Sequence, residues 1–504
     1  MEAGELTPNS SVLATASGSA SGGRAALRAP QRPSRASFST GTRFFRPQLG
    51  QTRMRLAVVP PVVDIARSSQ ALGPGLRFKV RASQAGQLGT AIWPCPGETA
   101  QLGAARALRG GAAAHPGGLR AVRGFVRSPW RIVRGHFAGD RLPGREDALC
   151  MEFGIALATS TESWRAVVRA EQLGFAHAWF YDTQLLNADV FVAMTQAAMH
   201  TERIRLGTGV LVPSNRIEPV TANALATLAK IAPGRIDFGV GTGFTARRTM
   251  GLGALPLARM KLYVERVQAL LRGETIEWDL EGRTRKLRFL NPDFCLINLD
   301  DEIPLHVSAM GPKARRMAAE LGGGWLNFGG QLDPAVADLN DIRSAWTAAG
   351  HAHPLHSTFF TLGCVLRPGE ALDSERVLAQ AGPWVSVFLH NLVEATEAGT
   401  MEGLLPPVAY EALERYREIY RSYEPEDARY LTNHRGHLMF QRPEERPLMS
   451  AELIETLMGF VGTPDTLRTR IRALAEAGYS QLAIQLVEHH EDALEEWAQV
   501  FEAV

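Results

Sequence analysis

The chain has 504 residues, an ordinary apolar fraction of 45% and a formal net charge of +2. It contains no run of about 18 apolar residues, so the sequence predicts no membrane-spanning helix. The cysteines Cys95, Cys150, Cys295 and Cys364 form no CxxC pair, which argues against a cysteine-based zinc site and fits a reducing, cytoplasmic setting.

The net charge hides two unlike parts of the chain. Residues 1–150 hold 21 Lys and Arg against 7 Asp and Glu, a balance of +14, which leaves 33 basic and 45 acidic residues, a balance of −12, for the rest. The first part is rich in Gly, Ala, Pro, Ser and Arg, as in SGSASGGRAALRAPQRPSRAS, and such a composition predicts disorder. The net charge of −12 on the second part weighs against nucleic-acid binding by that part.

Three interpretations of residues 1–150 remain open. The segment could be an arginine-rich arm that touches nucleic acid or an acidic surface, or an organelle presequence. It could also be untranslated in vivo, with synthesis beginning at Met151. We favour the last, because an apolar strand, Phe153–Leu157, follows Met151 at once.

From Met151 onward the pattern alternates between strands and helices. The predicted strands are Phe153–Leu157, Ala178–Tyr181, Ile204–Leu211, Ile236–Val240, Pro304–Ser308, Trp325–Phe328, Thr358–Val365 and Gln481–Val487. The predicted helices are Ser163–Leu173, Val190–Met199, Pro219–Ile231, Ala258–Arg272, Lys313–Leu321, Pro334–Ala349, Pro464–Ala477 and Glu491–Val504. Eight strand–helix pairs predict an α/β fold, a (β/α)8 TIM barrel over residues 151–504.

The interval 366–463 is too long for a plain connection after the seventh strand and contains a predicted helix of its own, Val408–Tyr420. Long insertions in barrels sit on loops at the C-terminal face, where ligands bind. We therefore expect this insertion to lie over the barrel mouth.

The stretch RIDFGVGTGFTARRTMG ends the fourth strand with glycines at 239, 241 and 243 and fits the G-x-G-x-x-A form of a dinucleotide fingerprint. A Rossmann turn opens a helix at once and is followed by a second strand with an acidic residue about 20 positions on. Here Gly251, Gly253 and Pro256 discourage a long helix, and Glu265 falls inside one. The glycines either let the backbone approach a flat ligand or permit positive φ in a tight turn.

The chain from Met151 on resembles the luciferase-like flavin and deazaflavin oxidoreductases. The similar segments are AEQLGFAHAWFYDT, then RIRLGTGVLVPSNRIEPVTANALATLAKIAPGRIDFGVGTG, then PLHVSAMGPKARRMAAELGGGWL. They look most like methylenetetrahydromethanopterin reductase-type members, which use coenzyme F-420. The resemblance implies an oxidoreductase that transfers hydride between F-420 and a small organic substrate. The alternatives are an FMN-dependent monooxygenase that uses O2 and a partner flavin reductase, and a barrel that has lost its cofactor; a homodimer is a further expectation.

The resemblance also implies roles for matching positions. Gly209 and Val210 match the bulge that backs the cofactor ring, where deazaflavin-using members often have a non-prolyl cis peptide. Thr242 and Gly243 match positions whose backbone contacts the ring. The loop that lies beside the cofactor tail and phosphate in the family matches Ser308, Ala309, Met310, Gly311 and Pro312. Independently of the family, Gly311-Pro312-Lys313 opens a predicted helix, whose free N–H groups and lysine suit an anion. The alternative is that Pro312 is merely the first residue of an ordinary helix.

Asp182 ends the second strand, where deazaflavin-using relatives commonly carry an Asp-His pair; here Thr183 follows, so the sugar-phosphate dehydrogenase reaction is not carried over. Asp182 is expected either to bond to the ring or substrate as a catalytic residue, or to cap the next loop. Weaker substrate-side candidates are Asn187, Asn215, Glu218 and Phe244, the last of which replaces an acidic residue common in relatives.

Two histidines in the insertion, His434 and His437, are spaced i, i+3 and could act as an acid or base near neutral pH. Packing within a lid is the alternative. A metal site needs a third ligand, which this segment does not clearly supply, so no metal is expected. Glu488-His489-His490 follows the eighth strand, where an ordinary loop is the simpler interpretation.

Overall fold

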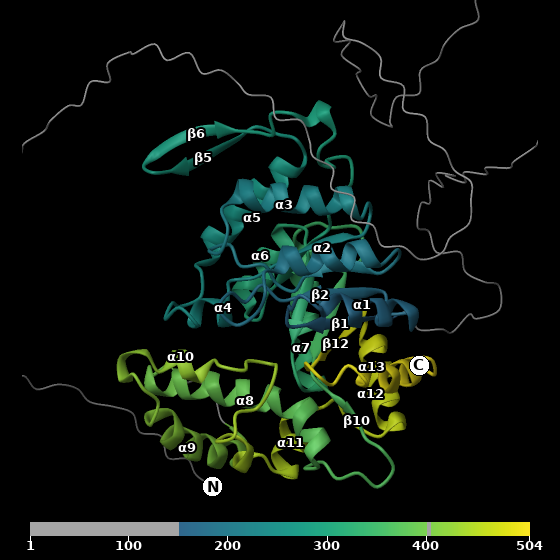
Figure 1. Ribbon diagram of the computed structural model, residues 1–504, viewed down its shortest axis with the longest axis vertical. Helices are drawn as coiled ribbons and strands as arrows, with labels where there is room; N and C mark the ends of the chain where they lie inside the picture. The colour runs from purple at the N-terminus through teal and green to yellow at the C-terminus, as the bar shows by residue number, and fades with distance from the viewer. Residues whose placement is uncertain (1–150, 401–404) are drawn as a thin grey trace, which may run out of the picture. The chain divides into compact units, whose positions relative to one another are not determined.

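The computed structural model describes residues 151–400 and 405–504, which form a closed eight-stranded parallel barrel with helices between the strands (Figure 1). The predicted extension over residues 1–150 lies outside the described residues. The barrel strands are β1 (Glu152–Leu157), β2 (His177–Phe180), β3 (Arg205–Thr208), β4 (Ile236–Val240), β7 (Leu305–Ser308), β8 (Gly324–Phe328), β9 (Ser357–Thr361) and β12 (Gln481–Leu486). The (β/α)8 prediction is confirmed, with all eight strands at the expected places.

Closure of the barrel is made by its first and last strands. β1 pairs in parallel with β2 on one side and with β12 on the other, in a register that sets Glu152 opposite Gln481 and Leu157 opposite Leu486. The strands are buried almost throughout because the barrel interior covers one face and the helices cover the other.

The helices that cover the barrel are α1 (Ser163–Gln172), α2 (Val190–His200), α3 (Glu218–Ile231), α5 (Leu257–Leu271), α6 (Pro312–Glu320), α7 (Leu332–Ala348), α12 (Pro464–Ala477) and α13 (Ala493–Phe501). Local sequence fixes several of their starts. The Asp189 side chain accepts hydrogen bonds from two N–H groups at the start of α2, and Thr463 caps α12 in the same way. No helix among the described residues has the length and apolarity needed to cross a membrane.

Two elements near β4 and α5 differ from the sequence prediction. A short helix, α4 (Phe244–Arg248), begins directly after Gly243, so the expectation that no helix follows the glycines at once is wrong in detail. The long helix α5 still comes later, and no Rossmann strand follows α4. An antiparallel hairpin, β5 (Ile276–Leu280) with β6 (Arg283–Leu287), was not predicted.

The insertion after β9 is largely helical. It holds α8 (Glu375–Glu397), α9 (Pro407–Arg421), α10 (Tyr430–Asn433) and α11 (Ala451–Leu457), and short strands β10 (Cys364–Val365) and β11 (Val461–Gly462) pair at its base. These helices group together in Figure 1, apart from the helices that surround the barrel. They share a second apolar core with the barrel interior, which includes Trp179 and Phe360. The predicted helix at 408–420 corresponds to α9, whereas α8 was not predicted.

Candidate functional site

A cavity of about 550 Å³ lies at the carboxyl ends of the barrel strands. Its lining comes from the ends of β2, β3, β4, β7 and β8 and from α4, α5, α6 and the insertion. The lining residues are Tyr181, Asp182, Thr183, Gly209, Val210, Val212, Gly241, Thr242, Gly243, Phe244, Thr245, Ala246, Leu257, Ser308, Met310, Gly311, Ala314, Phe328, Trp384, Val387, Phe388, Asn391, His437 and Leu438. Segments far apart in sequence therefore meet at the face where TIM barrels bind ligands.

Bare backbone forms one side of this cavity. The peptide bond between Gly209 and Val210, directly after β3, is cis and non-prolyl, as the resemblance implied. On the neighbouring strand, a Cβ at Gly241 would lie 2.6 Å from Cγ2 of Val210 and 3.3 Å from Cβ of Ser308. The wall is thus shaped by the lack of a side chain at Gly241.

At position 243 the backbone conformation gives an additional reason for glycine. Gly243 is the N-cap of α4 with φ of +77°, in the left-handed region that favours glycine. A Cβ there would also lie 2.4 Å from Cγ1 of Val212. Both Thr242 and Gly243 line the cavity, but the geometry of Gly243 supports the tight-turn interpretation at that position.

The N-terminus of α6 opens onto the same cavity. Ser308, Met310, Gly311 and Ala314 line it. The lining formed by the described residues does not include the other predicted residues of this loop, Ala309, Pro312 and Lys313. The carbonyl of Ala309 accepts the indole N–H of Trp325 at 2.9 Å, and Lys313 is exposed beside the helix start.

Asp182 is buried and already bonded to the loop that follows β3. Its carboxylate accepts hydrogen bonds from the backbone N–H of Val212 (3.2 Å), the amide of Asn215 (3.1 Å) and the guanidinium of Arg216 (2.8 Å). Asp182 also lines the cavity. These contacts support the loop-capping interpretation, since three donors already occupy the carboxylate.

The substrate-side candidates are scattered. Phe244 lines the cavity, is partly exposed, and has the guanidinium of Arg248 3.7 Å from its ring centroid. Asn215 bonds to Asp182 and to Gln184 instead. Asn187 lies outside the described lining, and Glu218 accepts the indole N–H of Trp278 at 2.8 Å, on α3. Only Phe244 of this group is placed to touch a ligand in the cavity as the structure describes it.

The two predicted histidines of the insertion lie at different depths. His437 lines the cavity, and its Nε2 lies 3.0 Å from Oγ1 of Thr245 on α4. His434 is 1% exposed and sits behind it, with Nε2 2.7 Å from a carboxylate oxygen of Glu394. Glu488 and His489, after β12, are exposed and outside the described lining.

A third imidazole joins this pair. His390 on α8 is 2% exposed, and one ring nitrogen each from His390, His434 and His437 lie within 4.8 Å of one another. Nε2 of His390 is 2.5 Å from Oε1 of Glu445. Burial alone would raise the pKa of Glu445, but the hydrogen bond from His390 and the charge of Arg442 lower it to about 2. Burial lowers the pKa of His390 and of His437, so both rings are neutral near pH 7.

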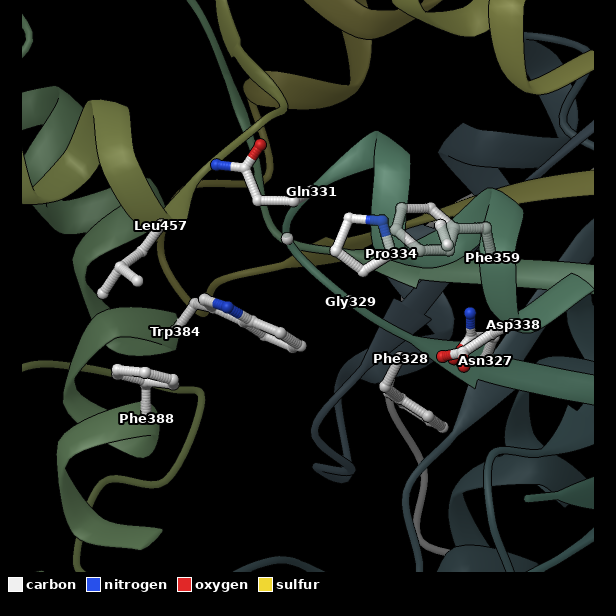
Figure 2. A pocket seen from close by; sticks show the side chains of 12 residues that line it. Asn327, Phe328, Gly329, Gln331, Pro334, Asp338, Phe359, Trp384, Phe388 and Leu457 are labelled. Atoms are coloured by element: carbon white, nitrogen blue, oxygen red, sulfur yellow. The ribbon is translucent and has the colours of Figure 1, made fainter. Parts of the chain in front are cut away.

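A smaller cavity of about 250 Å³ adjoins the first and shares Phe328, Trp384 and Phe388 with it. Figure 2 shows Trp384 and Phe388 on α8 facing Phe328 at the end of β8 across this space. The ring of Phe328 stacks on Phe360 with centroids 4.6 Å apart. Aromatic side chains from both the insertion and the barrel therefore line this smaller cavity along one side of the site.

Sequence reasoning missed the contribution of α8, namely Trp384, Val387, Phe388, His390 and Asn391. The apolar residues at 385, 389 and 393 recur at helical spacing, which was an available signal, but Gly382-Pro383 interrupts the pattern. Thr245 was missed as well, because its role depends on a contact with the insertion.

A sequence model of the luciferase-like monooxygenase family matches residues 151–481. Among curated relatives, 5,10-methylenetetrahydromethanopterin reductase of Archaeoglobus fulgidus is 28% identical over 341 residues, covering 66% of this chain and 92% of that protein. F420-dependent glucose-6-phosphate dehydrogenase of Beutenbergia cavernae is 37% identical over 157 residues, covering 28% of this chain and 45% of that protein.

Solved structures share the fold at lower identity. The coenzyme F420 dependent tetrahydromethanopterin reductase of Methanopyrus kandleri superposes with a TM-score of 0.53 at 21% identity, covering 69% of this chain and 97% of that one. Because the family match spans well over half of the 504 residues, the chain belongs to the luciferase-like monooxygenase family and is an oxidoreductase.

Proposed function

We propose that this oxidoreductase binds coenzyme F420 in the larger cavity and transfers hydride between it and a small organic substrate. The observation that carries the proposal is the side of the cavity formed by Gly209, Val210 and Gly241. The lack of a side chain at Gly241 leaves room there for a flat ring, and a single added Cβ would reduce that room. A relative named as F420-dependent is 37% identical to this chain over 157 residues. The cofactor supplies the hydride chemistry when bound, and the barrel positions it.

The N-terminus of α6 suits the phosphate-bearing tail of such a cofactor. Backbone N–H groups at the start of a helix have no partner within it and carry partial positive charge. Gly311 and Ala314 place this helix start on the cavity, and the exposed Lys313 adds a full charge beside it. This arrangement supports anion binding at one end of a cavity whose other walls are largely apolar.

The insertion supplies the substrate side. Trp384, Val387 and Phe388 of α8 line the cavity, and Phe244 adds an apolar side chain from α4. Thr183 follows Asp182, where relatives often carry a histidine, so we do not assign the sugar-phosphate reaction. A small, mainly apolar organic molecule fits these walls better than a sugar phosphate.

Titration of the purified protein with F420 and, separately, with FMN tests the proposal, with fluorescence as the measurement. Tighter binding of F420 supports it.

Lys313→Ala should weaken F420 binding about threefold to tenfold and reduce its salt dependence, because one charge near the phosphate is lost. Lys286→Ala, on the β6 hairpin, is the matched control and should leave binding unchanged. Binding of neither cofactor would overturn the proposal.

A second candidate is an FMN-dependent monooxygenase that receives reduced FMN from a partner reductase. The family description and the aromatic residues that α8 contributes to the cavity lining, Trp384 and Phe388, favour it. Tight binding of FMN with no binding of F420, together with O2 consumption when reduced FMN and substrate are supplied, would select this candidate instead.

A further inference from the structure

Three imidazoles gather where the insertion meets the barrel, and each has at least one buried ring nitrogen without a hydrogen-bond partner among the described residues. Nδ1 of His390, of His434 and of His437 is buried and has no hydrogen-bond partner among the described residues. A buried ring nitrogen without a partner is costly, so three of them together call for an explanation. Packing alone does not supply one.

We propose that His390, His434 and His437 bind a divalent transition-metal ion of the zinc class. One ring nitrogen of each lies within 4.8 Å of the other two, whereas tetrahedral coordination at 2.0–2.1 Å sets such nitrogens about 3.4 Å apart. Small side-chain rotations close this difference. Imidazole nitrogen suits Zn2+, Co2+, Ni2+ and Cu2+ and does not suit Mg2+ or Ca2+.

The opposite nitrogen of each ring lies beside an oxygen atom of the kind that orients metal-bound histidines. Nε2 of His390 faces the carboxylate of Glu445 at 2.5 Å, and Nε2 of His434 lies 2.7 Å from a carboxylate oxygen of Glu394, an ion-pair contact without hydrogen-bond geometry. Nε2 of His437 faces the hydroxyl of Thr245 at 3.0 Å. Acceptors at Nε2 favour the tautomer with the proton there, which leaves the lone pair on Nδ1 for the ion.

The elements around the cluster hold this arrangement. His390 lies on the long helix α8, and His434 and His437 lie in the turn after α10. The ring centroids of His390 and His434 are 6.2 Å apart, and those of His434 and His437 are 6.4 Å apart, both in edge-to-face geometry. Two guanidiniums lie near the cluster. That of Arg442 is 3.3 Å from Nε2 of His390 and is paired with Glu445, and that of Arg248 is paired with Glu394 at 3.1 Å, so two carboxylates balance two guanidiniums around the rings.

The site adjoins the larger cavity, because His437 lines it beside Thr245 and Asn391. Three protein ligands leave a fourth position of a zinc-type ion for water or for a polar atom of a bound molecule. The bound ion also joins α8 and the α10 turn, so it fixes the segment that covers the cavity.

Glutamine variants separate metal binding from support of the fold. A glutamine in place of a histidine keeps an N–H donor near the position of Nε2, where it can face Glu445 at position 390, Glu394 at position 434 or Thr245 at position 437. It lacks Nδ1, the atom proposed to bind the metal. The full chain, stripped with a chelator, is titrated with Zn2+ and with Co2+, with metal content, the Co2+ absorption spectrum and the melting temperature as measurements. We expect about one bound equivalent, and a melting temperature that rises with excess Zn2+.

His390→Gln, His434→Gln and His437→Gln should each weaken Zn2+ binding at least tenfold and abolish the rise in melting temperature. Thr245→Val, which leaves all three ligands, should weaken it about tenfold through loss of the partner of Nε2. His200→Gln, at the exposed end of α2, is the matched control and should bind as the parent does. The proposal is overturned if the parent binds no more Zn2+ than the triple variant, or if the folded single variants bind as tightly as the parent.

Discussion

Gly241 and Gly243 are two residues apart in sequence and differ in backbone conformation. A Cβ would collide with a valine of the cavity wall at either position, Val210 for Gly241 and Val212 for Gly243, but only at Gly243 is the backbone also left-handed. The sequence alone left ring approach and turn geometry as alternatives for the whole motif. The positive φ supports turn geometry at Gly243, and we propose close ring approach at Gly241.

This division predicts opposite phenotypes for two alanine variants. Gly241→Ala should weaken F420 binding at least tenfold, about 1.4 kcal/mol, with a small change in melting temperature, because the new Cβ narrows the cavity. Gly243→Ala should instead lower the free energy of unfolding by about 1–2 kcal/mol or more, since an L residue at positive φ is strained. Melting curves and fluorescence titrations on both variants check this. Equal effects of the two variants on binding would contradict the assignment.

At the other end of the barrel, His177 predicts a pH dependence of stability. Its ring is buried, and Nδ1 accepts a hydrogen bond from the amide of Gln481 at 2.6 Å. Burial lowers the pKa of His177 to about 4, although the charges of Asp237 and Glu152 oppose the shift. The unfolded chain takes up a proton near pH 6.5, and the folded protein does so only near pH 4.

Stability should therefore be complete above pH 6.5 and should fall as the pH drops toward 4, with this residue contributing about 3 kcal/mol at most. His177→Gln should flatten that part of the curve of unfolding free energy against pH. The measurement is denaturant unfolding at several pH values between 4 and 8. A variant with the same slope as the parent would show that other groups carry the effect.

At the scale of elements, the sequence was sufficient to predict the bounds of a helix or strand wherever its apolar residues follow a simple period. The strand Ile236–Val240 and the helix Pro464–Ala477 were predicted with the bounds that the structure has, because buried apolar runs, Thr463 and Pro464 mark them. The hairpin β5–β6 was missed although Glu281 and Gly282, both at positive φ, form its turn.

The helix α8 shows why part of the site could not be predicted. Gly382 and Pro383 lie inside it and mimic a helix end, yet the helix continues to Glu397 because one face packs into the second apolar core. The histidine cluster depends on this packing, since His390 is far in sequence from His434. The glycine wall, by contrast, was predicted from the family resemblance, because its residues lie directly at strand ends.

The position of α8 predicts a selective effect of Trp384→Ala. Trp384 lines both cavities and comes from the insertion rather than from the glycine-bearing strand ends, so its removal should raise KM for the organic substrate about tenfold and change F420 affinity less than threefold. Leu262→Ala, exposed on α5, is the control and should change neither quantity. A larger loss of F420 affinity than of substrate affinity would place the cofactor against α8 instead.

At the scale of the whole molecule, the barrel closes on residues that all follow position 150. β1 begins at Glu152 and pairs with β2 and β12, so no strand edge of the closed barrel is left for a preceding segment to fill. The buried cluster around the barrel begins with Met151 itself. The described residues thus form a closed barrel with a continuous buried cluster of their own.

A chain that begins at Met151 should therefore fold and bind cofactor as the full chain does. We expect melting temperatures within about 2 °C of each other and F420 affinities within about twofold, because the change removes no described core contact. The net charge of the protein changes from +2 to −12 with the loss of residues 1–150, so the shorter chain should also bind more weakly to anionic surfaces. Nucleic-acid binding by the full chain alone would support the arginine-rich arm. Loss of folding in the shorter chain would show that residues 1–150 contribute to the core after all.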